Sequence, residues 1–379
     1  MGVIDKESIG YKHIVVVTIA FFLISFWLHY PNLVPNNYSD VVSIWHRDGV
    51  RDGLLPYVDY DLEYPVLTGL AVYVSSLSHD LYAYYHTMNL IILALILLST
   101  YVLYKILKSS GQPLHKINYY VIFTPTFVFF TIYSFDWIGV SLLLFSMYFS
   151  YTKKAHLSGL FMGLAVAARI IPIVCLPFIL REFKTWRERI ILLVIAGAAW
   201  LVPNAFFMIA DFNGFLYPYT FQGQWGVEDS WFIVFGQFFD GRQNLSMILL
   251  VSLLALILFY HKRFTVKEAC LLALLAFMLT SFKFPPQYMI LLLPFFAINR
   301  INYTLFMTAN ILNLLIILWW FTPTFNLGSP LLISSPVQWV AIARQIVLIP
   351  IFLSFFRFRR GVDDVNCSNS GSFTPSNNR

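Results

Sequence analysis

Long apolar runs, repeated along the chain, constrain the fold of this protein more than any other feature of its sequence. A helix that crosses the hydrocarbon core of a bilayer needs roughly 20 apolar residues at about 1.5 Å each. Runs of this kind lie at 13–34, 82–107, 117–134, 137–152, 190–210, 245–260, 268–282, 288–299, 301–321 and 338–356. Charged residues make up only 12% of the 379 residues, about half the share in a soluble domain. The sequence therefore excludes a soluble enzyme, a disulfide scaffold and a disordered chain, and predicts an all-α polytopic membrane protein.

Lysine and arginine indicate how the chain is oriented, because short basic loops stay on the cytoplasmic side of a membrane. Basic clusters lie at 105–116, 153–154, 181–189, 262–267 and 357–360. Placing all of them in the cytoplasm agrees with the order of the spans and puts both termini there. The net charge of +6 then belongs to the cytoplasmic loops of a multi-pass protein of the cell membrane, and no nucleic-acid partner is expected.

Two segments do not fit simple crossing helices. Segment 157–180 has basic clusters at both ends and contains Pro172 and Pro177, which predicts a re-entrant hairpin that starts and ends on the cytoplasmic side. Segment 64–79 is short, and 82–107 already returns the chain inward, so 64–79 is expected in the outer interface. The total is about 11–12 transmembrane or re-entrant helices in one domain, 1–360. The remainder, 361–379, is rich in Ser and Asn and predicts a disordered cytoplasmic tail.

The first outer loop, 35–63, is large and acidic. Its carboxylates between positions 40 and 63 are Asp40, Asp48, Asp52, Asp59, Asp61 and Glu63. An ordinary solvated loop is the plain interpretation, but this one is threaded with aromatic residues, and 40–51 can form an amphipathic helix. A carboxylate at the lip of a membrane cavity suits a general base for a sugar hydroxyl. Asp59-Tyr60-Asp61 also forms a D-x-D pair, which could hold Mg²⁺ or Mn²⁺.

Several short motifs follow in a fixed order. An aspartate after the first apolar run precedes G-x-x-P-Y (Gly53 to Tyr57) and E-Y-P-x-L (Glu63 to Leu67), and these are followed by Phe135-Asp136-Trp137, by GLFMGLAVAARIIPIVCLPFIL (159–180) and by Phe284-Pro-Pro-Gln-Tyr288. The order resembles that of the GT-C superfamily of integral-membrane glycosyltransferases. The closest pattern is that of the polyprenyl-phosphate-mannose-dependent α-mannosyltransferases and of the first mannosyltransferase of GPI-anchor synthesis. The resemblance covers roughly residues 10–300.

The resemblance implies a GT-C-like fold with Asp40 as the catalytic base. It implies a hexose, mannose by the closest pattern, carried on a polyprenyl or dolichyl phosphate and transferred on the extracytoplasmic side to a glycan or lipid acceptor with inversion. Two departures matter: Arg169 stands where lysine is usual, and Ser39-Asp40-Val41 replaces the paired D-x-D of the GPI enzyme. No cofactor is therefore implied with certainty, and Mg²⁺ or Mn²⁺ stays open.

Charges inside the apolar runs are candidates for substrate contact. Arg344, within the last run, could snorkel to the outer surface or clasp the donor phosphate. Arg169, at the tip of the hairpin, must find a carboxylate, helix-end carbonyls or an anion. Lys283 is a further phosphate candidate. Asp136 begins a helix, so capping is its first interpretation and substrate contact its second.

The remaining predicted contacts are polar and aromatic. Gln224, near Gln222 and Trp225, suits sugar hydroxyls, and the predicted substrate-binding set is completed by Tyr57, Asp59, Asp61, Glu63, Gln287 and Tyr288. The expected partners are the lipid-linked sugar donor, the acceptor and membrane lipid. A secondary transporter or a flippase for lipid-linked sugars is the alternative function, since either would use intramembrane charges. Only one broken helix and no internal repeat are visible in the sequence, which favours the enzyme.

Overall fold

Helices are the only extended regular secondary structure in the described part of the chain. The computed structural model describes residues 6–34, 38–47 and 49–357, and within these it contains only two isolated β-bridges besides helices and loops. Six helices are long and apolar enough to cross a membrane: α1 (Lys6–Leu28), α4 (Leu81–Ser109), α10 (Trp186–Ala210), α12 (Arg242–Phe259), α15 (Tyr303–Trp320) and α17 (Pro336–Arg357). This agrees with the predicted all-α polytopic membrane protein. The predicted tail, 361–379, lies outside the described residues.

Four of the predicted spans form shorter or interrupted helices. They are α7 (Asp136–Tyr151), α13 (Val266–Thr280), the run α5 (His115–Ile117), η1 (Asn118–Ile122) and α6 (Pro125–Phe130), and the pair η5 (Pro286–Leu292) and α14 (Leu293–Ile298). Proline begins α6 and η5, and its missing N–H interrupts the helical ladder at those points. Segment 64–79 contains α3 (Val66–Ser76), whose 11 residues are too few to cross a bilayer.

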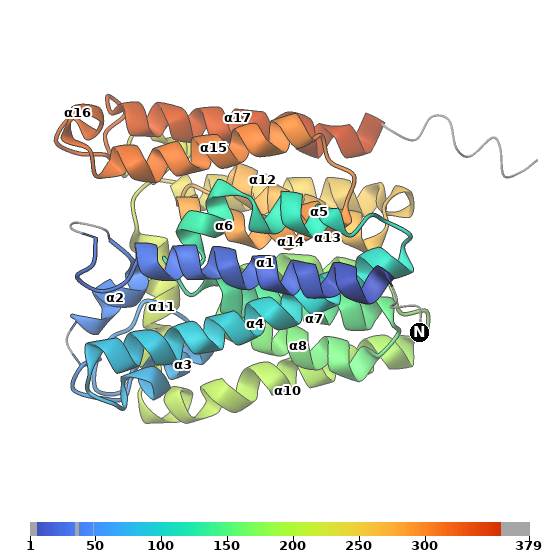
Figure 1. Ribbon diagram of the computed structural model, residues 1–379, viewed down its shortest axis with the longest axis horizontal. Coiled ribbons are helices and arrows are strands. Elements are labelled where there is room, and N and C mark those ends of the chain that lie inside the picture. Colours follow the sequence, from blue (N-terminus) through green and yellow to red (C-terminus); the bar gives the residue numbers. More distant parts are fainter. Residues whose placement is uncertain (1–5, 35–37, 48, 358–379) are drawn as a thin grey trace, which may run out of the picture.

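The long helices run side by side, and their connections gather at the two ends of the bundle (Figure 1). Buried side chains crowd α7 and α13, which form the centre of the core. At the end of the bundle opposite the start of α1 lie α2 (Asp40–Trp45), α11 (Phe212–Gln224) and α16 (Pro323–Asn326) (Figure 1). Segments far apart in the sequence therefore meet at that end.

Segment 157–180 reverses its direction within the bundle. It consists of α8 (Ala155–Ala168), η2 (Ile171–Cys175) and α9 (Leu176–Leu180). Just outside its two ends, Lys153 Nζ lies 2.8 Å from Glu182 Oε2, so the chain returns to the place from which it departed. Arg169 lies at the turn. The placement of this hairpin in a bilayer stays a prediction.

Two glycines let α8 lie directly on α10. Gly159 and Gly163 are one helical turn apart, so they share a face of α8. A Cβ at Gly159 would stand 2.5 Å from the carbonyl oxygen of Leu192, and a Cβ at Gly163 would lie still closer to that of Ala196. This G-x-x-x-G contact brings two backbones together, as at many helix pairs in membranes. It fixes α8, and with it the turn at Arg169.

We expect Gly163→Val to destabilise the protein by about 1–3 kcal/mol, because an added side chain must push α8 away from α10. Gly197→Ala is the matched control, since no atom lies within 4 Å of a Cβ at that position of α10. Thermal unfolding in detergent, followed by size-exclusion chromatography, measures both. A Gly163→Val protein as stable as the Gly197→Ala protein would contradict the close approach of the two helices.

Candidate functional site

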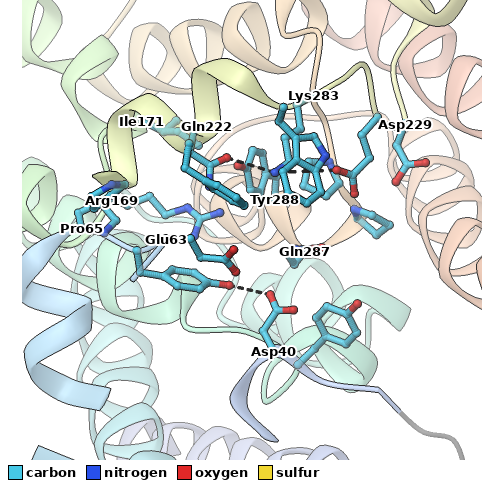
Figure 2. Close-up of a pocket in the computed structure, with 18 of the residues that line it drawn as sticks. Asp40, Glu63, Pro65, Arg169, Ile171, Gln222, Asp229, Lys283, Gln287 and Tyr288 are labelled. Carbon is cyan, nitrogen blue, oxygen red and sulfur yellow. Dashed lines mark hydrogen bonds and ion pairs between the residues drawn. The ribbon is translucent and has the colours of Figure 1, made fainter. Parts of the chain in front are cut away.

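A cavity of about 420 Å³ is lined in part by residues of α2 and α11 (Figure 2). Its walls come from the first outer loop, the hairpin turn, α11, the segments 225–229 and 283–288, and the end of α15. The charged lining residues are Asp40, Arg47, Glu63, Arg169, Glu228, Asp229 and Lys283. In Figure 2, Asp40 lies on one side of the cavity, with Gln222 and Lys283 across from it.

Asp40 is held in place by its own short helix. Ser39 precedes α2 and its Oγ accepts a hydrogen bond from Val42 N at 3.2 Å, and Asp40 N donates to the carbonyl oxygen of Tyr133 at 2.8 Å. The predicted amphipathic helix over 40–51 is wrong beyond Trp45, where α2 ends. Gly49 adopts a φ of 91°, a conformation that turns the chain and that glycine tolerates. The short helix leaves the Asp40 carboxylate in the cavity wall.

The Asp40 carboxylate is held by tyrosines. Tyr64 donates its hydroxyl to Asp40 Oδ2 at 2.7 Å, and Tyr57 donates its own to the carbonyl oxygen of Tyr64 at 2.5 Å. Burial raises the pKa of Asp40 to about 6, and the hydrogen bond from Tyr64 opposes this rise. A carboxylate with a pKa near neutrality can both hold and release a proton at physiological pH, which suits a general base.

Arg169 extends from the hairpin turn into the cavity. Its Nε lies 2.8 Å from Oδ1 of the fully buried Asp136, and its guanidinium lies 4.6 Å from the ring centre of Tyr288. Asp136 lies in the first turn of α7, where a negative charge is favoured by the helix dipole, but it makes no capping hydrogen bond. Its carboxylate pairs with Arg169 instead. The terminal nitrogens of Arg169 make no hydrogen bond to any described residue. The edge of the guanidinium that carries these nitrogens therefore faces the cavity, and no group of the described residues is bound to it.

Lys283 lies on the wall across from Asp40 (Figure 2). Its ammonium group is 3.8 Å from Glu228 Oε2, donates to Gln222 Oε1 at 3.2 Å and lies 4.1 Å from the ring centre of Trp225. The backbone joins the same two segments, because Glu228 N donates to Phe282 O at 3.1 Å and Phe284 N donates to Glu228 O at 2.9 Å.

Arg344 does not line the cavity. Its side chain is fully buried, which rules out snorkelling to the surface. Nη1 donates to Asn313 Oδ1 at 2.6 Å, and Nη2 donates to the carbonyl oxygens of Asp229, at 3.0 Å, and of Phe284. The interpretation of Arg344 as the group that binds the donor phosphate is therefore wrong, because Nη1 and Nη2 donate their hydrogen bonds to other residues of the protein. Arg344 ties the segments that carry Glu228 and Lys283 to α17.

Other predicted residues lie away from the cavity. Tyr57 is buried behind Tyr64, and Asp59 and Asp61 are exposed on the loop, where Asp59 Oδ2 accepts a hydrogen bond from Leu55 N at 2.8 Å. Gln224 is exposed as well. Across residues 6–34, 38–47 and 49–357, no group of three or more His, Cys, Asp or Glu side chains is placed to hold a metal ion. By contrast, Glu63, Gln287 and Tyr288 do line the cavity.

The sequence analysis missed three parts of the site. The acidic pair Glu228-Asp229 lines the cavity, Tyr64 donates to Asp40, and Trp320 and Phe321 at the end of α15 contribute aromatic wall. The only signal for the pair was its place beside Trp225 in an outer loop.

Comparison with known proteins gives no further assignment: no protein-family model and no curated protein matches this chain.

We expect Tyr64→Phe to raise the pKa of Asp40 above its value of about 6, by about one pH unit, because the lost hydrogen bond stabilised the ionised carboxylate. Infrared difference titration of the carboxyl stretch measures this, with Asp40→Asn assigning the band. Tyr219→Phe is the control, since Tyr219 also lines the cavity but is not among the groups that shift the pKa of Asp40. An unmoved titration in Tyr64→Phe would refute the role of its hydroxyl.

Proposed function

We propose that this protein is an integral-membrane glycosyltransferase that moves a hexose, mannose by resemblance, from a polyprenyl-phosphate donor to a hydroxyl of a glycan or lipid acceptor. The observation that carries the proposal is that a carboxylate and a guanidinium edge share one cavity. Asp40 makes no ion pair within 4.0 Å with any described residue, and Arg169 presents its terminal nitrogens to the same space. A base and an anion-binding group are the two parts that this reaction needs.

The donor phosphate fits the cationic side of the cavity. The planar edge of Arg169 matches phosphate oxygens in a two-pronged arrangement, and Lys283 supplies a second positive charge on the same lining. Aromatic side chains in the walls, among them Trp225, Tyr288 and Trp320, offer flat apolar surfaces to a sugar ring. The lipid chain would extend along the apolar, outward-facing helices such as α12.

In the proposed reaction, Asp40 accepts the proton of the acceptor hydroxyl while the oxygen attacks the anomeric carbon of the donor. The new glycosidic bond forms as the bond between that carbon and the phosphate oxygen breaks. The polyprenyl phosphate departs with the bonding electrons, and Arg169 and Lys283 stabilise the charge that develops on it. Attack from the side opposite the leaving group inverts the anomeric configuration.

The location of the cavity supports an extracytoplasmic site. The cavity lies at the end of the bundle away from the basic connections that follow α4 and precede α10 (Figure 1). Basic loops favour the cytoplasm, which leaves the cavity on the other side, with the protein in the cell membrane and both termini cytoplasmic.

A transporter or flippase remains the second candidate, because the broken segments at the hairpin turn and at η5 both reach the cavity, as discontinuous helices do at transporter sites. However, the lining residues come from one end of the bundle only. A one-sided cavity suits an enzyme better than a route across the membrane.

We expect Asp40→Asn to lower sugar transfer by about 10²–10⁴-fold, because the amide cannot accept the hydroxyl proton. Purified protein in detergent, given radiolabelled polyprenyl-phosphate mannose and a membrane lipid extract as acceptor, measures the transfer. Undiminished transfer in Asp40→Asn would remove this residue from the mechanism. Movement of the labelled lipid between leaflets of proteoliposomes, without a glycosidic product, would favour the flippase.

We expect Arg169→Met to lower the free energy of unfolding by about 3–5 kcal/mol, because it leaves the buried Asp136 without a counter-charge. The double variant Arg169→Met/Asp136→Asn should regain much of the stability, yet its KM for the donor should stay raised, because no guanidinium meets the phosphate. Thermal unfolding and donor kinetics separate the two effects. A double variant with a normal donor KM would contradict phosphate binding by Arg169.

A further inference from the structure

The ion pair between Lys283 and Glu228 is unusually loose for a pair inside a cavity. The nitrogen and oxygen are 3.8 Å apart, while both side chains are largely buried, at 14% and 13% exposure. Strong pairs between ammonium and carboxylate groups are hydrogen-bonded at about 2.7–2.9 Å. Glu228 Oε2 is buried and has no hydrogen-bond partner among the described residues. Glu228 thus neutralises Lys283 without holding it firmly.

The backbones of the two residues are fixed even though the side chains are not. Two hydrogen bonds join the segment of Glu228 to that of Lys283, and Arg344 grips the carbonyl oxygens of the neighbouring Asp229 and Phe284. The segments therefore stay together when the side chains move. Lys283 also keeps Gln222 and the ring of Trp225 as partners on its cavity side. A ligand can replace the Glu228 carboxylate without disturbing the wall.

We propose that Glu228 is a resident counter-ion that a phosphodiester anion displaces from Lys283, and that Glu228 takes up a proton as the anion binds. The inference deepens the proposed function, on which it rests for the identity of the anion as the lipid-linked donor. The phosphodiester enters with its negative charge, and the proton that Glu228 takes up comes from solvent. The total charge of the site is then unchanged by binding.

The surroundings of Glu228 make this exchange necessary. The charged or titratable groups near it are Lys283, Asp229, Glu63, Tyr133 and, beyond Asp229, Arg344. Burial raises the pKa of Glu228, and the charge of Lys283 and a hydrogen bond with Trp225 lower it only in part. Burial and the charge of Glu228 likewise raise the pKa of Asp229. A further negative charge beside these carboxylates would be repelled, unless the carboxylate facing Lys283 were protonated.

The affinity for the anion therefore depends on pH. At low pH Glu228 is protonated and Lys283 is available to the anion. As the pH rises through the pKa of Glu228, the carboxylate ionises and competes for Lys283, so anion affinity falls.

Farnesyl methyl phosphate tests the exchange, because a phosphodiester keeps a constant charge where a phosphate monoester titrates near pH 6. Calorimetry of the protein, in buffers of different ionisation enthalpy, should show proton uptake on binding and an affinity that falls as the pH rises through the raised pKa of Glu228. In Glu228→Gln the proton uptake should vanish, and the affinity at a pH above that pKa should exceed that of the unaltered protein at least about tenfold. Binding without proton uptake in the unaltered protein, at a pH above the pKa of Glu228, would overturn the proposal, whatever the stability of the variant.

Matched variants locate the proton. Glu63→Gln removes another cavity carboxylate, one already paired with Arg47 at 3.1 Å, and Asp40→Asn removes the proposed base. Proton uptake should persist in both, and its loss in either, with persistence in Glu228→Gln, would refute the role of Glu228. Lys283→Met should weaken binding of the anion, and unchanged binding would refute the role of Lys283.

The probes separate this inference from the proposed function. Farnesyl methyl phosphate carries no sugar, so its binding does not depend on transferase activity, and a Glu228 effect without any transfer would sustain the exchange while the glycosyltransferase proposal fails. Inorganic phosphate shows whether the anion alone suffices, and a Glu228-dependent response to it would also support the exchange. Farnesol has no charge, and proton uptake with farnesol would overturn the exchange.

Discussion

A charged side chain among apolar helices must find a counter-charge or a set of hydrogen bonds, because leaving it bare is too costly. This requirement organises the cavity. Arg169 pairs with Asp136, Arg47 with Glu63, and Lys283 with Glu228, while the terminal nitrogens of Arg344 donate to an amide oxygen and two backbone carbonyls. Two cavity carboxylates have only neutral hydrogen-bond donors as side-chain partners: Asp40 accepts from the hydroxyl of Tyr64, and Asp229 accepts from the amide of Gln338. The group that the proposed reaction needs as a base is thus one of the two that form no ion pair within the described residues.

Irregular backbone is concentrated where these charges meet. The hairpin turn at Arg169 and the 3₁₀ helix η5, preceded by Lys283, both interrupt helices and both reach the cavity. Backbone groups freed from a helical ladder are tolerated at membrane depth only where they line a cavity or are buried in protein. The close contact of α8 with α10 through Gly159 and Gly163 gives the hairpin a rigid base. The regular packing of α8 on α10 thus supports the irregular backbone of the hairpin turn, where Arg169 reaches the cavity.

The long apolar runs and the acidic loop were predictable, because helix length and charge are local properties of the sequence. The role of Arg344 was not, because its partners Asn313, Phe284 and Asp229 lie 31, 60 and 115 positions away. Composition cannot distinguish an arginine that donates hydrogen bonds to backbone carbonyls from one that binds phosphate. The helix predicted over 40–51 was too long, because apolar spacing carries no information about the turn that Gly49 makes. Asp59 was misplaced for a similar reason, since its carboxylate closes its own loop.

Two cavity carboxylates have opposite tasks in the proposed reaction, and their hydrogen bonds differ accordingly. Asp40 must be ionised to accept a proton, whereas Glu228 must be protonated for Lys283 to receive an anion. Burial raises the pKa of both. Tyr64 then favours the ionised form of Asp40, while Glu228 Oε2 has no hydrogen-bond partner among the described residues, and the hydrogen bond with Trp225 offsets the effect of burial on Glu228 only in part. Unequal hydrogen bonding of two carboxylates is a means of separating an acid from a base within one site. In this way, a cavity with nearly balanced charges can hold an anion and still keep a free carboxylate beside it.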